Sequence, residues 1–187
     1  MRFILNRFPE DPDFVANEEW VALKESSNLW VVQLQALPFA FINAAIVILL
    51  MRLIGINFDF NSNTMLLSFL VFIPIHELIH ALFFPESLKS KNVYLGFTFK
   101  GFAPFAAYIG EIKRNTFIKV LLAPFIIISI ACFFYLLIFG RNELIEHIFL
   151  FNAISACADC LGVFLFMIQV PKGAIMKNKG IRSYWRK

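Results

Sequence analysis

Four long apolar runs, separated by polar segments, organise the chain. Each is long enough to cross the hydrocarbon core of a bilayer as a helix, which takes about 20 residues. The runs extend over residues 29 or 36 to 54, 64–84, 117–139 and 145–170. This pattern predicts an all-α integral membrane protein with about four transmembrane helices, and a short β-hairpin in the loop between spans two and three.

In the loop between spans two and three, the pattern of apolar and polar residues differs from that of the spans. Over residues 92–99 apolar side chains alternate with small or polar ones, as is typical of a strand. Lys100 and Gly101 form a turn signal before residues 102–108, and Pro104 is typical of an edge strand. The predicted hairpin either caps the bundle from the solvent side or dips against the membrane, where its edge could pair with an unwound substrate segment.

The two ends of the chain are polar. Residues 1–28 carry six acidic side chains, and residues 18–27 are either a helix at the membrane interface or loosely ordered. No apolar core followed by a small-residue cleavage site occurs near the start, so we expect no cleaved signal peptide. We therefore divide the chain into a lead-in (1–28), a four-span domain (29–170) and a basic tail (171–187).

Composition and charge place this domain in a membrane. The chain is 59% hydrophobic and 16% charged, which is far from a soluble protein. All lysines and arginines except Arg52 and Arg141 lie before span one, between spans two and three or at the very start of span three (Lys119), or after span four. The positive-inside rule then predicts a multi-pass cell-membrane protein with both termini and the central loop in the cytoplasm. We expect the lipid bilayer as a partner and no nucleic acid.

The second run contains His76-Glu77-Leu78-Ile79-His80. Histidines four residues apart share one face of a helix and can offer imidazole nitrogens to one metal ion. Glu77 can take a proton from a water held by the metal, which is the general-base role in zinc hydrolases. Alternatively, these side chains only hydrogen-bond neighbouring helices. Since an ionisable residue near the bilayer centre costs about 2.5 to 3.5 kcal/mol, a functional site is favoured.

A polar stripe runs along the fourth span. Asn152, Ser155 and Asp159 are three and four residues apart, so they share a helix face. At about 1.5 Å per residue, Asp159 lies roughly 21 Å from the outer end of its span, and His76 and His80 lie roughly 18 and 24 Å from theirs. Asp159 can therefore complete the three protein ligands of a catalytic zinc site, unless it only packs between helices.

Other candidate ligands fit less well. Cys157 and Cys160 are spaced as CxxC, but Cys157 points about 160° away from Asp159 on the helical wheel. We expect both to pack between helices and, like Cys132, to be reduced thiols. We expect His147, at the outer end of span four, to be an interfacial residue. Two imidazoles and a carboxylate suit Zn²⁺ best in a hydrolase.

These features together resemble a known family. They are HExxH in an early span, the following hairpin, Ala123-Pro124-Phe125 in the next span, and the Asn-x-x-Ser-x-x-x-Asp stripe in the last. They look like the putative zincin peptidases of bacterial membranes, which are similar in layout to the site-2 intramembrane zinc metalloproteases. The resemblance covers about residues 20–170. The chain departs from the site-2 pattern at Cys160-Leu161, where a glycine is expected, and lacks that pattern's prolines before the aspartate.

The resemblance implies a zinc-dependent metalloendopeptidase and gives roles to six residues. The implied roles are zinc ligands for His76, His80 and Asp159, catalytic base for Glu77, and substrate binding for Asn152 and Ser155.

We expect hydrolysis of a peptide bond in a membrane or membrane-proximal protein, with Glu77 activating a zinc-bound water. A substrate helix must first be partly unwound, so cleavage is expected near the cytoplasmic end of a span with weak helix propensity. Two other functions stay open. One is a non-proteolytic metal-binding membrane protein, either a chaperone-like partner or an ion transporter, which would tolerate Glu77→Gln. The other is a structural protein that binds no zinc.

Overall fold

Four helical stretches are long and apolar enough to cross a membrane in the computed structural model, which describes residues 1–187. They are α1 (Leu29–Leu53), α2 (Ser62–Phe83), α3 (Arg114–Phe139), and α4 (Glu143–Ser155) with α5 (Cys157–Gln169), which together form the fourth span. The predicted number of spans and their approximate positions are confirmed. The chain is thus a membrane protein by the length and composition of its helices.

Asparagines fix where three of these helices begin. Asn28, Asn61 and Asn142 precede α1, α2 and α4 with extended backbone. Each side-chain oxygen accepts a hydrogen bond from a backbone N–H of the following turn. These bonds satisfy donors that a helix leaves free at its N-terminus, where no apolar packing can do so.

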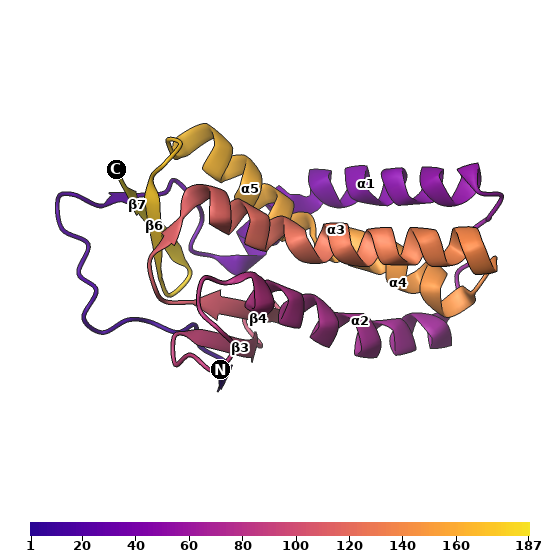
Figure 1. Cartoon of the computed structure of the whole chain (residues 1–187), viewed down its shortest axis with the longest axis horizontal. Helices are drawn as coiled ribbons and strands as arrows, with labels where there is room; N and C mark the ends of the chain where they lie inside the picture. Colours follow the sequence, from indigo (N-terminus) through magenta and orange to yellow (C-terminus); the bar gives the residue numbers. More distant parts are fainter.

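The helices form a bundle around the fourth span. α4 packs against α1, α2 and α3, and α5 packs against α1 and α3. Figure 1 shows the helices running along the long axis, with the β-strands and both chain ends gathered at one end. One buried apolar cluster, which includes Phe72 and Phe149, lies between the helices, and a second, which includes Val93 and Met176, joins the helix ends to the strands.

The all-α prediction is wrong, because the chain forms two β-sheets. The first has the order β1 (Arg2–Leu5), β3 (Val93–Thr98), β4 (Ala103–Tyr108), and the second has the order β2 (Val21–Ala22), β7 (Arg182–Arg186), β6 (Ile175–Lys179), β5 (Ile112–Lys113). The predicted hairpin is present as β3 and β4, with Val93 opposite Tyr108. It is, however, only part of the first sheet.

The strands that the sequence did not reveal come mostly from the chain ends. β1 pairs in parallel with β3, and β2 pairs antiparallel with β7. Residues 18–27 form no helix, since two of them make β2 instead. These strands are two to five residues long, and β6 and β7 each carry two basic residues. Pairing with distant segments, rather than a local apolar alternation, therefore decides their structure.

The tip of the β3–β4 hairpin lies against the start of α1. Gly101 and Phe102 turn the chain with φ of 87° and 52°, in the left-handed region. The Gln33 side-chain amide donates to the Gly101 carbonyl at 2.6 Å, and a Cβ added at Gly101 would lie 2.9 Å from Leu29 Cβ. Glycine is required here for both its backbone angle and this close approach. The hairpin tip is thereby held at the level where the first span begins.

The fourth span is broken in its middle. Ala156 separates α4 from α5, and its backbone angles are φ −68° and ψ 2° instead of helical values. Figure 1 shows α5 continuing from α4 toward the end of the bundle that carries the strands. The break falls between Asn152 and Asp159, so it divides the predicted polar stripe.

Candidate metal centre

α2 carries the two histidines of the HExxH segment. Because one turn of an α-helix takes 3.6 residues, His76 and His80 project from the same face of α2. That face is packed against α3 and α4, and the histidines are only 5% and 6% exposed. Two imidazoles are thus buried side by side, with ring centroids 4.9 Å apart.

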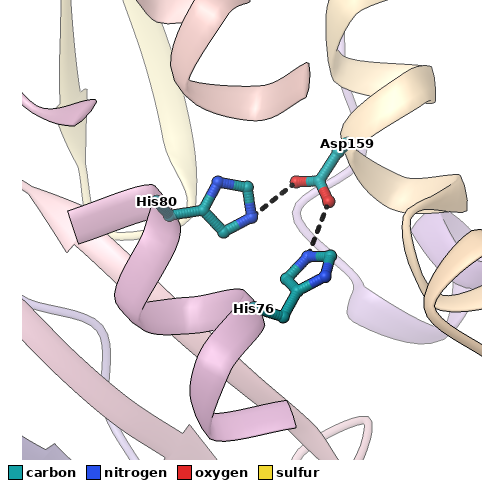
Figure 2. Close-up of side chains that lie close together, drawn as sticks. All are labelled: His76, His80 and Asp159. Atoms are coloured by element: carbon teal, nitrogen blue, oxygen red, sulfur yellow. Dashed lines mark hydrogen bonds and ion pairs between the residues drawn. The ribbon is translucent and has the colours of Figure 1, made fainter. Parts of the chain in front are cut away.

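The aspartate of the polar stripe meets them from α5. Asp159 lies in the first turn of α5. One of its carboxylate oxygens is 3.3 Å from His76 Nε2 and the other is 3.4 Å from His80 Nε2. Figure 2 shows both rings pointing from α2 toward the carboxylate between them. One ligand atom from each of the three residues lies within 4.8 Å of the others.

The other nitrogen of each ring is already bonded. His76 Nδ1 lies 2.9 Å from Asn152 Oδ1, and His80 Nδ1 lies 2.8 Å from the Val120 carbonyl oxygen. Both partners are oxygen acceptors, so each Nδ1 is the protonated nitrogen that donates. Each Nε2 then keeps its lone pair on the side of Asp159. Such outer hydrogen bonds orient imidazoles that ligate metals and fix their tautomer.

This donor set fits zinc. In a tetrahedral site with ligand bonds of about 2.0 to 2.1 Å, neighbouring ligand atoms are about 3.3 Å apart. The two separations between Asp159 oxygens and histidine nitrogens, 3.3 and 3.4 Å, are close to that spacing, although each involves a different carboxylate oxygen. With one ligand atom from each residue, the three atoms lie within 4.8 Å of one another, so small side-chain rotations would bring them to one zinc ion. Two imidazoles and one carboxylate are also a ligand combination of catalytic zinc sites, which keep a fourth position open. No cysteine belongs to the cluster.

The cluster opens onto a cavity of about 440 Å³. Its walls come from α1, α2, α3, β4 and the region around the break between α4 and α5, and most of the lining side chains are apolar. His76, His80, Asp159 and Glu77 all line it. A chain segment that enters this cavity would therefore meet the histidines and two carboxylates in otherwise apolar surroundings.

Glu77 faces β4 across this cavity. Ala106, in the middle of β4, lines the same cavity. Glu77 therefore lies between the histidines, which are on its own helix, and the first sheet. The sequence placed Glu77 beside the ligands, but it carried no signal that β4 would line the same cavity.

An acidic residue anchors β4 to the end of α2. The Glu86 carboxylate accepts hydrogen bonds from Tyr108 Oη at 2.7 Å, Asn92 Nδ2 at 2.9 Å and Ser90 Oγ. These bonds hold the pKa of Glu86 below its usual value, whereas burial and the bond to Glu86 raise the pKa of Tyr108. The Tyr108 ring also stacks on Phe84, which lines the cavity. The free edge of β4 is thereby fixed relative to the HExxH helix.

The two residues predicted to bind substrate are placed differently. Ser155 lines the cavity, and its hydroxyl donates to the Asn152 carbonyl at 3.1 Å. Asn152 is fully buried with its Oδ1 on His76, while its Nδ2 has no hydrogen-bond partner. A contact of either residue with substrate stays a prediction. The structure also shows that Asn152 contacts His76, one of the predicted zinc ligands.

Two further contacts were not anticipated. The Val120 carbonyl holds His80, and no side-chain pattern could identify it. Asn43 of α1 bonds the fourth span at its break, and here a signal existed, since it is a polar residue within an apolar run. His147 is not interfacial as expected. It is fully buried, where its Nε2 accepts a bond from the Asn61 N–H at 3.1 Å.

Comparison with known proteins finds one family. The family model described as "putative zincin peptidase" matches residues 69–175, which is more than half of the chain. The matched segment contains His76, Glu77, His80, Asn152 and Asp159. No curated protein and no solved structure matches.

Proposed function

Because the chain belongs to the family of putative zincin peptidases, we propose that it is a membrane-embedded zinc metalloendopeptidase that hydrolyses a peptide bond of a membrane or membrane-proximal protein. Family membership indicates a metallopeptidase and zinc as its metal. The finer proposal rests on one observation: His76, His80 and Asp159 converge from two spans on a cavity that Glu77 also lines.

Three side chains would hold the metal. They are His76 and His80 through Nε2, and Asp159 through its carboxylate. A zinc ion held there supplies a Lewis acid that lowers the pKa of water and polarises a substrate carbonyl. Asn152 and the Val120 carbonyl keep the two rings in the orientation that this requires, because they occupy both Nδ1 atoms.

Glu77 is the proposed general base. Its carboxylate takes a proton from the attacking water and passes it to the nitrogen of the leaving amine. Glu77 lines the same cavity as residues 103–106 of β4. Because Glu77 directly follows His76 on α2, the helix backbone fixes the base close to the two histidine ligands.

β4 is the proposed docking strand for the substrate. It is an edge strand, since only β3 pairs with it. Within an antiparallel strand the N–H and C=O of one residue point to the same side, and this side alternates along the chain. The Phe97 carbonyl accepts from the Asn6 N–H on the β1 side of β3. Pro104, which lies opposite Phe97, therefore directs its carbonyl away from β3, and so does Ala106 two residues later. Proline lacks an N–H, and the edge therefore offers mainly the carbonyls of Pro104 and Ala106 to the N–H groups of an unwound substrate.

The cavity and the charge distribution support a substrate from the membrane. Phe72, Phe84, Phe105 and Phe117 line the cavity, which suits the apolar side chains of a transmembrane segment. The strands, both termini and most basic residues lie at one end of the bundle, in agreement with a cytoplasmic location of that end. We therefore propose cleavage near the cytoplasmic end of a substrate span.

The test is proteolysis in liposomes that contain the purified protein and single-span substrates with Gly and Pro near the cytoplasmic end, with products identified by mass spectrometry. Glu77→Gln should lower the cleavage rate by about 10²- to 10⁴-fold and leave the zinc content unchanged. The matched control is Glu143→Gln, an exposed glutamate at the far end of the bundle, which should cleave like the wild type.

Different outcomes count against different parts of the proposal. Equal cleavage by wild type and Glu77→Gln would exclude Glu77 as the base. Cleavage restricted to fully soluble peptides would exclude a membrane substrate. A protein that binds zinc but cleaves none of the substrates would favour the non-proteolytic metal-binding function instead.

A further inference from the structure

The break in the fourth span contains no proline or glycine. Helices kink at proline, at Gly and Ser pairs, or where a side chain inserts into the backbone hydrogen-bond ladder. Ala156 stands between Ser155 and Cys157, and alanine is the residue that best continues a helix. Within the span, the Ser155 hydroxyl donates to the Asn152 carbonyl, which bends the helix locally. The next carbonyl, that of Ala153, is bonded by a group from another element.

Asn43 of α1 contacts the span at this point. Its side-chain Nδ2 donates to the Ala153 carbonyl at 3.0 Å. In an unbroken helix that carbonyl would accept the N–H of Cys157, the first residue of α5. The same Nδ2 lies 3.5 Å from Cys160 Sγ, so Asn43 contacts α4 and α5 on either side of Ala156. Asn43 thus inserts into the ladder of a neighbouring helix.

The placement of Asn43 in α1 is costly without such a partner. It is 5% exposed and lies in the middle of a 25-residue apolar helix. A buried amide that lacks hydrogen bonds is unfavourable, more so in a membrane where water cannot replace the partner. The bond to Ala153 satisfies one of its donors. The same bond gives the Ala153 carbonyl a partner in place of the backbone N–H that it would bond in an unbroken helix.

The break lies between the two residues of the fourth span that reach His76. Asn152, before it, holds His76 Nδ1, and Asp159, after it, approaches His76 Nε2. The angle between α4 and α5 therefore sets whether both contacts can be made to one imidazole. We propose that Asn43 is a positioning residue of the metal centre, which holds the break at Ala156 and so holds Asp159 against His76 and His80. This inference rests on the proposed zinc site.

The test compares zinc affinity in Asn43 variants with that in a packing control. Asn43→Leu keeps the volume of the side chain and removes the amide, and Asn43→Ala removes both. Val47→Ala, one turn further along the same buried face of α1, removes packing but no hydrogen bond. Zinc affinity is measured on detergent-purified protein by competition with a chelator, beside the thermal stability of the metal-free protein and the visible spectrum of the Co²⁺ form.

Both Asn43 variants should bind zinc at least about tenfold more weakly than the wild type, as is usual when a group that orients a ligand is lost. Their Co²⁺ spectra should also shift. Val47→Ala should lower the thermal stability but leave affinity and spectrum unchanged. If either folded Asn43 variant binds zinc like Val47→Ala, with the wild-type spectrum, the inference is wrong. If the wild type itself binds no zinc, the proposed function fails first.

Discussion

Each end of the helical bundle buries a histidine beside an acidic residue, yet only one end can hold a metal. At the strand end, His76 and His80 use Nδ1 for outer hydrogen bonds and turn Nε2 toward Asp159. At the opposite end, His147 uses both nitrogens. Nδ1 contacts the Glu143 carbonyl at 2.8 Å, and Nε2 accepts the Asn61 N–H. No lone pair of His147 is left for a ligand.

The acidic residues differ in the same way. Glu146 is fully buried at the far end, but Arg141 donates to its Oε1 at 3.1 Å and also pairs with Asp59. Asp159 has no arginine or lysine beside it, and its carboxylate is shared by two histidines. At the far end, Arg141 thus pairs with Glu146 and both nitrogens of His147 are bonded, although Glu146 Oε2 is buried without a hydrogen-bond partner. The strand end leaves two imidazole nitrogens and a carboxylate facing one point.

Residue type alone does not separate these clusters, because both combine histidine, a carboxylate and asparagine. What separates them is how many hydrogen-bonding positions the surrounding backbone and side chains already occupy. A histidine with one nitrogen bonded is oriented for a metal, whereas a histidine with both bonded is part of the packing. The following predictions test this difference by making matched changes at the two ends.

The largest contrast is expected between Asp159→Asn and Glu146→Gln. Asparagine at 159 removes the carboxylate ligand and so weakens zinc binding. Peptide cleavage should therefore fall by roughly a thousandfold. Glutamine at 146 removes the charge that Arg141 pairs with, so stability should fall by about 1 to 3 kcal/mol with cleavage unchanged. Liposome cleavage assays and thermal unfolding measure both. Equal activity losses would erase the distinction between the ends.

The next contrast uses asparagines that contact the histidines. Asn152→Ala removes the acceptor of His76 Nδ1, and zinc affinity should drop by about 10- to 100-fold. Asn61→Ala removes the N-cap of α2, which costs about 1 kcal/mol of stability, but keeps the backbone N–H that bonds His147. Its zinc affinity should equal that of the wild type. Chelator competition gives both affinities, and an unchanged value for Asn152→Ala would refute the orienting role.

The smallest effect concerns Glu25, a half-buried carboxylate at the strand end that is not part of the metal cluster. Burial raises the pKa of Glu25 to about 6, although the Ser183 N–H donates to it. A raised pKa means that the folded state holds the proton more tightly than the unfolded state. Its contribution to stability is thus complete below about pH 4.5 and is lost as the pH rises through about 6.

Thermal unfolding of wild type and Glu25→Gln between pH 4 and 8 measures this contribution. The wild type should lose stability relative to Glu25→Gln over that window. A stability difference that stays constant with pH would show that the Glu25 carboxyl does not titrate in the folded protein with a raised pKa.

The sequence was sufficient for the parts of the site that depend on helical spacing. His76 and His80 are four residues apart, and Asp159 lies at a similar depth in its span, so their convergence followed from the rise per residue and span ends. The four spans followed from apolar length. The cytoplasmic orientation, and the roles of these residues in catalysis, stay predictions.

The parts that the sequence did not reveal depend on distant pairing. β1 and β2 have four and two residues and form only because β3 and β7 lie beside them. Ser155 is the one local signal for the break at Ala156, and the group that holds the break, Asn43, comes from another span. His147 looked interfacial because nothing in its own helix showed that Asn61 would reach it. In each case the deciding contact joins residues far apart in the chain.

The most direct test of the account is the metal content of the detergent-purified protein, measured by mass spectrometry for the wild type, His80→Ala and His147→Gln. Near-stoichiometric zinc is expected in the wild type and in His147→Gln, and almost none in His80→Ala. Zinc that is lost equally in both variants, or absent from the wild type even after zinc is added, would contradict the assignment of the metal centre to His76, His80 and Asp159.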